Sequence, residues 1–218
     1  MSMGTLNSGI TRQTFDHQDF MAKTTIWDRY AMFQDIHVMI YVGFGFLMVF
    51  LKTNQWTSVG FSYLIAAWCY QIALLLIPFW DMWFNAEYFT KINFTLESLI
   101  KADFAAAAVL ISFSALVGKM KFIQLFVFGT LEVVFYSLNL AITYGTFKHS
   151  DVGGGITIMV FGAFFGIFAT WWFTPKKAIA NERGGRGSYS SQTVAMVGTL
   201  FLFMYWPSFN AALVNGVA

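Results

Sequence analysis

The sequence contains a single cysteine, three prolines and few charged residues, which make up 11% of its 218 positions. Soluble domains carry about 25% charged residues. A chain with 57% hydrophobic residues and a mean hydropathy of +0.60 would expose more apolar surface than a soluble fold tolerates. The lone Cys69 excludes a disulfide framework and a thiolate metal cluster within one chain. Because the net charge is only +2, no nucleic-acid partner is expected.

Apolar stretches long enough to cross a lipid bilayer, which takes roughly 20 residues per helix, recur six times along the chain. The alternation typical of a membrane β-barrel is not seen. The expected fold class is therefore an all-α polytopic membrane protein with about six transmembrane helices, embedded in a lipid bilayer. The expected spans are residues 33–51, 58–77, 96–117, 122–144, 152–173 and 192–214.

The polar segments between and before these spans divide the chain into two parts. Residues 1–30 form a polar N-terminal arm, and residues 31–218 form one six-helix transmembrane domain, with residues 174–188 as its long linker. Pro78 is expected to end the second span, which would place Trp80 and Trp83 in an interfacial loop.

The distribution of lysine and arginine predicts the orientation of the chain. If the N-terminus faces the non-cytoplasmic side, seven of the thirteen basic residues fall in cytoplasmic loops, which is the favoured arrangement. These seven are Lys52, Lys119, Lys121, Lys176, Lys177, Arg183 and Arg186. Both termini would then lie on the non-cytoplasmic side.

Ionisable residues at membrane depth are costly and are therefore candidates for function. Glu97 and Lys101, four residues apart, predict an ion pair on one helix face. Glu132 lies near the middle of the fourth span, where a hydrogen bond to a neighbouring helix and a functional role both remain open. Asp151 precedes three glycines and suits a helix N-cap. The other ionisable residues near the spans are Asp35, His37 and Asp103.

Glycines recur at the start and along the length of the fifth span. Gly153–Gly155, Gly162 and Gly166 predict a stripe that allows close helix packing.

A haem held by two axial histidines needs both at matched depth, and only His37 lies near a span. Lys101 lies too close to a helix end for a retinal site. We therefore expect no cofactor, no metal ion and no enzymatic activity.

Four stretches of the sequence resemble the Rh glycoprotein branch of the ammonium transporter family. They are FQDIHVMIYVGFGFLMVFLK, LIKADFAAAAVLISFSALVGK, DVGGGITIMVFGAFFG and VAMVGTLFLFMYWPSFNAA. The resemblance implies half of an inverted-repeat fold, namely the first five-helix repeat plus one helix. It also implies a trimer with one pore per subunit, so a homotrimer is one expected partner arrangement.

Residue by residue, the resemblance gives a mixed result for the transport path. The two stacked phenylalanines of the family correspond to Phe104 and Phe209, and the aspartate that orders the fifth helix corresponds to Asp151. The pore histidine in the family pattern TIHTFGAYFG corresponds to Met159 of TIMVFGAFFG. An acidic residue in the vestibule of some Rh proteins corresponds to Leu140.

Two functions from different classes follow from this comparison. The first is a truncated, transport-inactive Rh-like protein that serves as a structural or accessory subunit with other membrane protein subunits, since Met159 replaces an imidazole. The second is an ammonia or ammonium channel completed by a second subunit, which the retained Phe104, Phe209 and Asp151 favour. A plasma membrane fits the family, whereas the inner membrane of an organelle equally fits a structural subunit.

Overall fold

The computed structural model describes residues 29–51, 55–84, 92, 94–174 and 187–212, and all of its regular elements are helical. Six of the helical segments are long and apolar enough to cross a membrane, which confirms the expected fold class. They are Arg29–Phe50, α3 (Gln55–Phe84), α4 (Leu96–Leu116), α5 with its continuation (Phe122–Thr146), Gly155–Phe173 and α8 (Tyr189–Ala211).

Three of these spans contain one turn of wider, π-helical geometry. These turns are Met39–Phe44, Ala141–Thr146 and Gly155–Val160. The first precedes α2 (Gly45–Leu47), the second follows α5 (Phe122–Leu140), and the third leads into α6 (Phe161–Phe173). Single π-helical turns are rare and occur frequently at functional sites.

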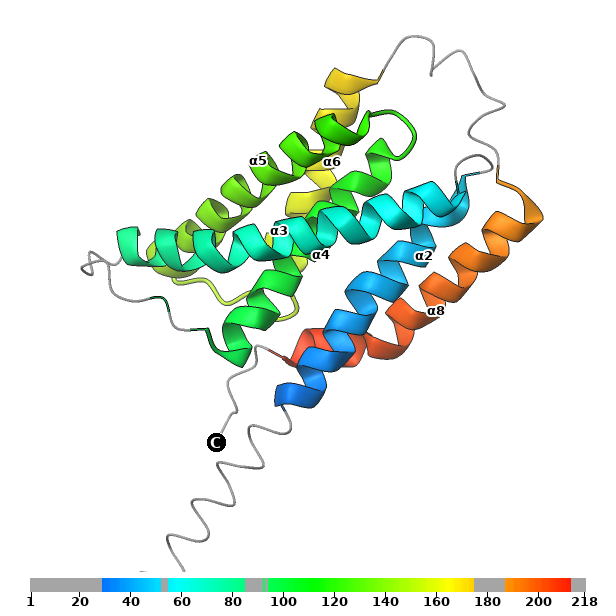
Figure 1. Cartoon of the computed structure of the whole chain (residues 1–218). Coiled ribbons are helices and arrows are strands. Elements are labelled where there is room, and N and C mark those ends of the chain that lie inside the picture. The colour runs from blue at the N-terminus through cyan, green and yellow to red at the C-terminus, as the bar shows by residue number, and fades with distance from the viewer. Residues whose placement is uncertain (1–28, 52–54, 85–91, 93, 175–186, 213–218) are drawn as a thin grey trace, which may run out of the picture.

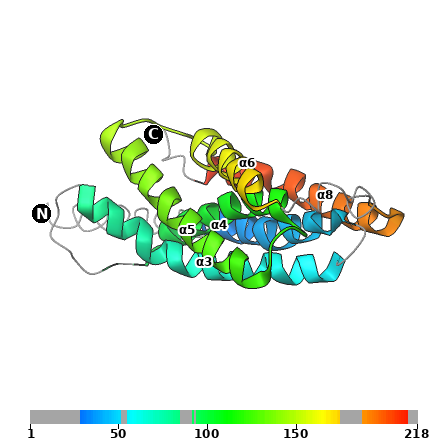
Figure 2. The ribbon, with the colours of Figure 1, turned by 90° about the horizontal axis from the view of Figure 1, so that it is seen from above.

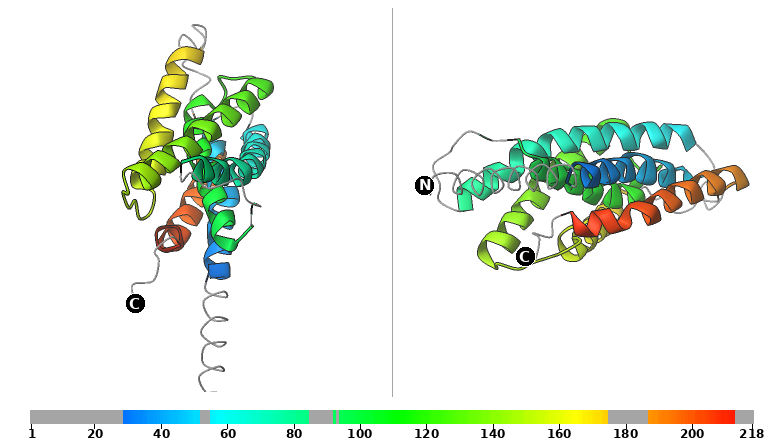
Figure 3. Two further views of the ribbon diagram at one scale, coloured as in Figure 1. Left: turned by 90° about the vertical axis from the view of Figure 1, so that its left-hand side faces the viewer. Right: turned by 90° about the horizontal axis from the view of Figure 1, so that it is seen from below.

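Helix α4 lies at the centre of the bundle. In its most apolar 18-residue window 72% of residues are buried, compared with 22% for Gly155–Phe173 and 17% for α8. Figure 1 shows α4 between two groups of helices, with α5 and α6 on one side and the first span and α8 on the other. The views from above and from the side agree (Figures 2 and 3). Helix α4 therefore contacts both groups.

Small residues set the distance between α4 and α6, as the sequence predicted. A Cβ atom added to Gly162 would lie 2.7 Å from the carbonyl oxygen of Ala108, and one added to Gly166 would lie 2.9 Å from the Cα atom of Ser112. Gly153 and Gly154 do not join this stripe, because their positive φ angles of 83° and 67° place them in a turn before the helix. The fifth span consequently begins at Gly155 rather than at residue 152.

The second span was predicted to end at Pro78, and this is wrong. Helix α3 continues to Phe84, with Pro78 inside it. Proline inside a membrane helix is tolerated when neighbouring groups satisfy the freed backbone. Beyond Pro78, the ring centroid of Phe79 lies 5.3 Å from that of Trp80 and 6.2 Å from that of Trp83, so aromatic packing supports the extra turns. At 1.5 Å per residue, the 30-residue helix is about 45 Å long.

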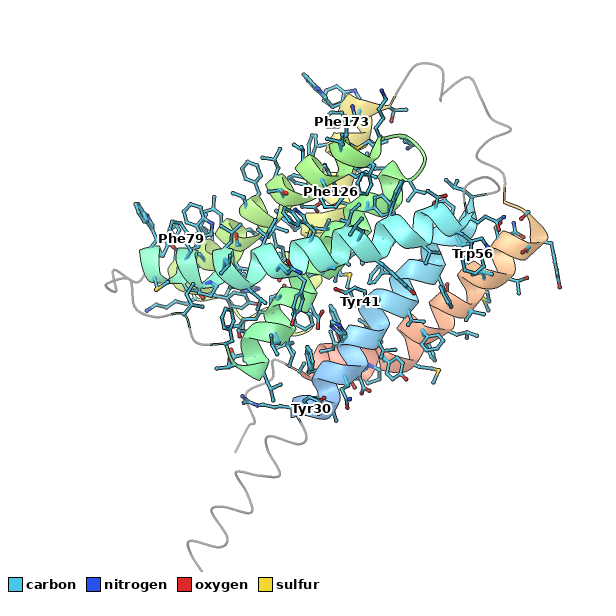
Figure 4. All side chains as sticks on the ribbon, in the orientation of Figure 1. Tyr30, Tyr41, Trp56, Phe79, Phe126 and Phe173 are labelled. Carbon is cyan, nitrogen blue, oxygen red and sulfur yellow. The ribbon has the colours of Figure 1, made fainter. Side chains whose placement is uncertain are left out.

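Aromatic side chains mark the ends of the spans. Figure 4 places Trp56 and Phe79 towards opposite ends of α3, and Phe173 at the end of α6. Trp56 is 69% exposed and Trp171 is 81% exposed. Rings at these positions fit the two aromatic belts of a membrane protein.

Other span ends differ from the predictions by a few residues. Arg29 and Tyr30 are already helical, so the first span takes the last two residues of the expected arm. Residues 1–28, together with residues 175–186 of the expected linker, lie outside the described part of the chain. The sixth span starts at Tyr189, because Ser188 and Ser191 form a reciprocal capping box.

Helices α4, α5 and α6 are joined by a buried polar contact. The hydroxyl of Ser112 on α4 contacts a carboxyl oxygen of Glu132 on α5 and lies 2.7 Å from the carbonyl oxygen of Gly162. Glu132 is fully buried, and its second carboxyl oxygen has no hydrogen-bond partner within the described residues. The interhelical hydrogen bond that was one alternative for Glu132 is therefore present.

The Ser112 hydroxyl should contribute measurably to stability. In Ser112→Ala, the Glu132 carboxyl loses the one hydrogen-bond partner that it has within the described residues, which costs about 1–3 kcal/mol for a buried polar group. We expect a clearly lower midpoint of thermal unfolding in detergent. Ser114→Ala is the control, since Ser114 bonds only to Ile111 of its own helix in the described structure. Equal midpoints for the two variants would contradict this role.

The contact between α8 and the first span should tolerate no added methyl group. A Cβ atom on Gly198 would lie 2.4 Å from the backbone nitrogen of Leu47 and 2.6 Å from the carbonyl oxygen of Gly43. Overpacking of this kind costs typically 1–3 kcal/mol, so we expect Gly198→Ala to lower the unfolding midpoint. Gly60→Ala on α3 is the matched control, because no atom lies within 4 Å of its added Cβ. Gly60→Ala should leave stability unchanged or raise it.

Candidate functional site

A pocket of about 280 Å³ lies among α3, α4, α5 and the Gly155 turn. Its polar lining includes the carboxylates of Asp81, Glu97 and Asp151 and the cations of Arg29 and Lys101. Carboxylates therefore outnumber basic groups by three to two. Phe104 also lines the pocket, which places the pocket directly beside the aromatic pair predicted from the resemblance.

The Glu97–Lys101 pair confirms the expected contact within one helix. The Lys101 nitrogen lies 2.9 Å from a Glu97 carboxyl oxygen, and both side chains are partly exposed. An exposed pair of this kind contributes only about 0.3–0.5 kcal/mol to stability. Its consequence for the pocket is electrostatic, since it neutralises one carboxylate and leaves Asp81, Asp151 and Arg29 to set the local charge.

Asp151 organises the turn at one edge of the pocket. One of its carboxyl oxygens accepts hydrogen bonds from the backbone nitrogens of Ile156 (3.0 Å) and Thr157 (2.7 Å) and from the Thr157 hydroxyl (2.8 Å). The N-cap residue of the helix that starts at Gly155 is Gly154, so Asp151 is not the N-cap itself, but its side chain caps the first turn from three residues before Gly154. A carboxylate at a helix N-terminus also complements the helix dipole.

Phe104, which lines this pocket, packs against Phe209 in a tilted arrangement. Their ring centroids are 4.4 Å apart, and the ring planes are inclined by 47°. Phe104 is 3% exposed and Phe209 is 1% exposed. Trp206 lies nearly parallel to Phe209, with ring centroids 5.1 Å apart. The structure thus brings these two rings, from α4 and α8, into direct contact.

Met159 lies in the π-helical turn Gly155–Val160 that Asp151 caps. Its backbone nitrogen donates a hydrogen bond to the carbonyl oxygen of Gly154 (3.0 Å), and its side chain is half-buried against the core. A thioether is a weak acceptor and donates no hydrogen bond, whereas an imidazole does both. Position 159, which the resemblance predicts to correspond to the family's pore histidine, is therefore occupied by a group that does not titrate.

Sequence reasoning missed several residues that line the pocket. Leu140, singled out as a lost acidic position, does line it, next to Tyr136 and Tyr144, which were not singled out. Asp81 was missed because the second span was expected to end at Pro78. The signal in the sequence that could have identified it was an acidic residue three positions beyond Pro78, in an otherwise apolar stretch.

Three comparisons with known proteins bear on this arrangement. A sequence profile of the Ammonium Transporter Family matches residues 10–218. The chain belongs to the ammonium transporter family. The Ammonium transporter Rh type C of Canis lupus familiaris is 45% identical over 188 residues, which cover 86% of this chain and 40% of that protein. The Ammonium transporter Rh type B of Mus musculus is 44% identical over 184 residues, covering 84% and 40%.

A solved structure supports the same family assignment. It is described as "Nitrosomonas europaea Rh50 and mechanism of conduction by Rhesus protein family of channels" and has a TM-score of 0.76 at 27% identity. The match covers 88% of this chain and 50% of that one. This ammonium transporter family chain thus spans about two fifths of the length of its curated relatives. The resemblance to the Rh branch is confirmed, and the orientation and the trimer stay predictions.

The Asp151 cap leads to a direct prediction about backbone opening. In Asp151→Ala, the amides of Ile156 and Thr157 lose an acceptor that contributes about 1.5–3 kcal/mol per charged hydrogen bond. Hydrogen–deuterium exchange in residues 153–158 should therefore accelerate by roughly tenfold or more. Asp151→Asn keeps an acceptor oxygen and should show a smaller increase. Unchanged exchange in Asp151→Ala would contradict the capping role.

Proposed function

We propose that this chain is a structural or accessory membrane subunit of the Rh type and that it does not conduct ammonia through its own path. The single observation that carries the proposal is Met159. An imidazole at that position would offer a donor and an acceptor and would titrate near neutral pH. The thioether of Met159 supplies no donor and accepts weakly, so a small polar solute that passes the phenylalanine pair would meet no strong partner there.

The phenylalanine pair is compatible with this proposal but does not separate the two candidates, because the resemblance gives the same pair to the family's transport path. Phe104 and Phe209 are in contact and almost fully buried, so no open passage leads between them. A subunit with such a closed aromatic pair and no histidine at position 159 fits an assembly role in a lipid bilayer together with other membrane protein subunits. This role uses the Rh helix packing without the chemistry of a transport path.

The pocket favours a second candidate function, an ammonia or ammonium path completed by another polypeptide. Its carboxylates outnumber its cations, which would attract a small cation towards Phe104. In this function the missing hydrogen-bonding groups opposite Met159 come from the second polypeptide. The two candidates therefore differ in whether an imidazole from elsewhere faces Met159.

Flux measurements on purified protein separate the two candidates. The full chain, reconstituted with its native partners in liposomes that contain a pH-sensitive dye, is mixed rapidly with an ammonium salt. We expect the rate of internal pH change to equal that of protein-free liposomes, for the native chain and for Met159→His alike. A native rate clearly above protein-free liposomes, reduced by Phe104→Trp, would overturn the proposal and support the second candidate. Gly60→Ala is the control substitution, since its added methyl group meets open space.

A further inference from the structure

The residues immediately before the two stacked phenylalanines are both bonded to the first span. Asp103 precedes Phe104, and its carboxyl oxygens lie 3.0 Å and 3.2 Å from the Nδ1 atom of His37. Ser208 precedes Phe209, and its hydroxyl donates a hydrogen bond to a carboxyl oxygen of Asp35 at 2.6 Å. Asp35 and His37, from one turn of the first span, therefore bond to the residues that directly precede Phe209 on α8 and Phe104 on α4.

The helical geometry of the first span explains how one turn reaches both helices. Successive residues of an α-helix point about 100° apart, so Asp35 and His37 lie on either side of Ile36. Ile36 is fully buried and faces the core. Asp35 thus reaches α8 on one side, while His37 reaches α4 on the other.

The contact on α4 is strongly constrained by burial. The Asp103 side chain is fully buried, and within the described residues His37 is the side chain that bonds to it. A buried carboxyl that loses its partner is costly. Removing the imidazole would therefore favour a shift of the α4 turn that also carries Phe104.

Aromatic rings hold the imidazole of His37 in its orientation. The ring centroid of His37 lies 4.6 Å from that of Tyr41, 5.4 Å from that of Phe33 and 5.9 Å from that of Tyr70. Figure 4 places Tyr41 where the first span faces the body of the bundle. These rings pack against one part of the imidazole, while 41% of the His37 side chain stays exposed, and they favour the orientation that faces Asp103.

We propose that Asp35 and His37 are positioning residues that hold Phe104 and Phe209 in their stacked, closed arrangement. The ring pair depends on the relative placement of α4 and α8, and the first span sets that placement through one hydrogen bond to each helix. The purpose of a closed pair rests on the proposed function, in which this chain does not conduct. The two hydrogen bonds and the ring contact do not depend on it.

Fluorine NMR of a single labelled ring tests the proposal. The full chain carries 4-fluorophenylalanine at position 209 and is studied in lipid nanodiscs, where the ring current of Phe104 contributes to the chemical shift. Phe104→Leu establishes the shift that follows from loss of that ring. We expect Asp35→Ala and His37→Ala each to move or split the resonance towards that position. Asp35→Asn and His37→Asn retain an acceptor and a donor, respectively, and should restore the native resonance.

A matched control removes an interhelical hydrogen bond elsewhere. Trp68 on α3 donates to the hydroxyl of Thr130 on α5 at 3.0 Å, so Thr130→Val should leave the position 209 resonance in place. If the alanine variants do not fold, Ser208→Ala removes the α8 contact with a smaller change and should still move the resonance. A native resonance in folded Asp35→Ala and His37→Ala, or in Ser208→Ala, would overturn the proposal.

The resonance is recorded without ammonium and without a flux measurement. A conducting chain with a displaced resonance in the alanine variants would therefore overturn the proposed function and leave the positioning role standing. A non-conducting chain with an unchanged resonance in the alanine variants would leave the proposed function standing and overturn the positioning role.

Discussion

Lipid offers no hydrogen bonds, so every polar side chain at membrane depth must find its partner inside the protein. In this chain α4 supplies several of those partners. Its Asp103 bonds to the first span, its Ser112 contacts α5 and α6, and its Ala115 carbonyl accepts a hydrogen bond from Thr170 on α6. The central position of α4 is therefore a consequence of polar satisfaction as well as of apolar burial.

The same helix links stability to the candidate site. Gly162 and Gly166 bring α6 against α4, and this fixes the turn that contains Met159 relative to Phe104. The first span holds α8 close through the contact at Gly198, and the Asp35 and His37 contacts lie on that same span. Helix packing and the closed phenylalanine pair thus depend on the same close contacts, so a substitution that loosens α4 should affect both.

Much of the fold could be predicted from the sequence, because membrane spans depend mainly on local composition. The six spans follow from the length of each apolar stretch. The close packing at Gly162 and Gly166 and the Glu97–Lys101 pair follow from residue spacing along a single helix. The continuation of α3 past Pro78 could not be predicted, since it depends on packing among Phe79, Trp80 and Trp83. The prediction that Gly153 and Gly154 join the packing stripe was wrong, because local sequence did not show that these two glycines adopt positive φ angles in a turn.

The candidate site could be predicted only in part, because some of its contacts depend on packing between distant helices. Resemblance singled out Phe104, Phe209, Asp151 and Met159, but no local pattern pairs Asp35 with Ser208 or His37 with Asp103. Those pairs join residues 173 and 66 positions apart, respectively, and exist only once the helices are packed. Ser112 as the partner of Glu132 was hidden in the same way, because small hydroxyl residues are common in apolar helices.

We propose that the Rh-type path of this chain is closed at Phe104 and Phe209 and lacks a titratable partner at Met159. The most direct test is an electron cryomicroscopy structure of the native assembly, isolated in a mild detergent with its lipids and partner subunits. We predict that the two rings remain in contact and that no imidazole faces Met159. Separated rings, with a histidine from elsewhere in the assembly directed at Met159, would contradict it.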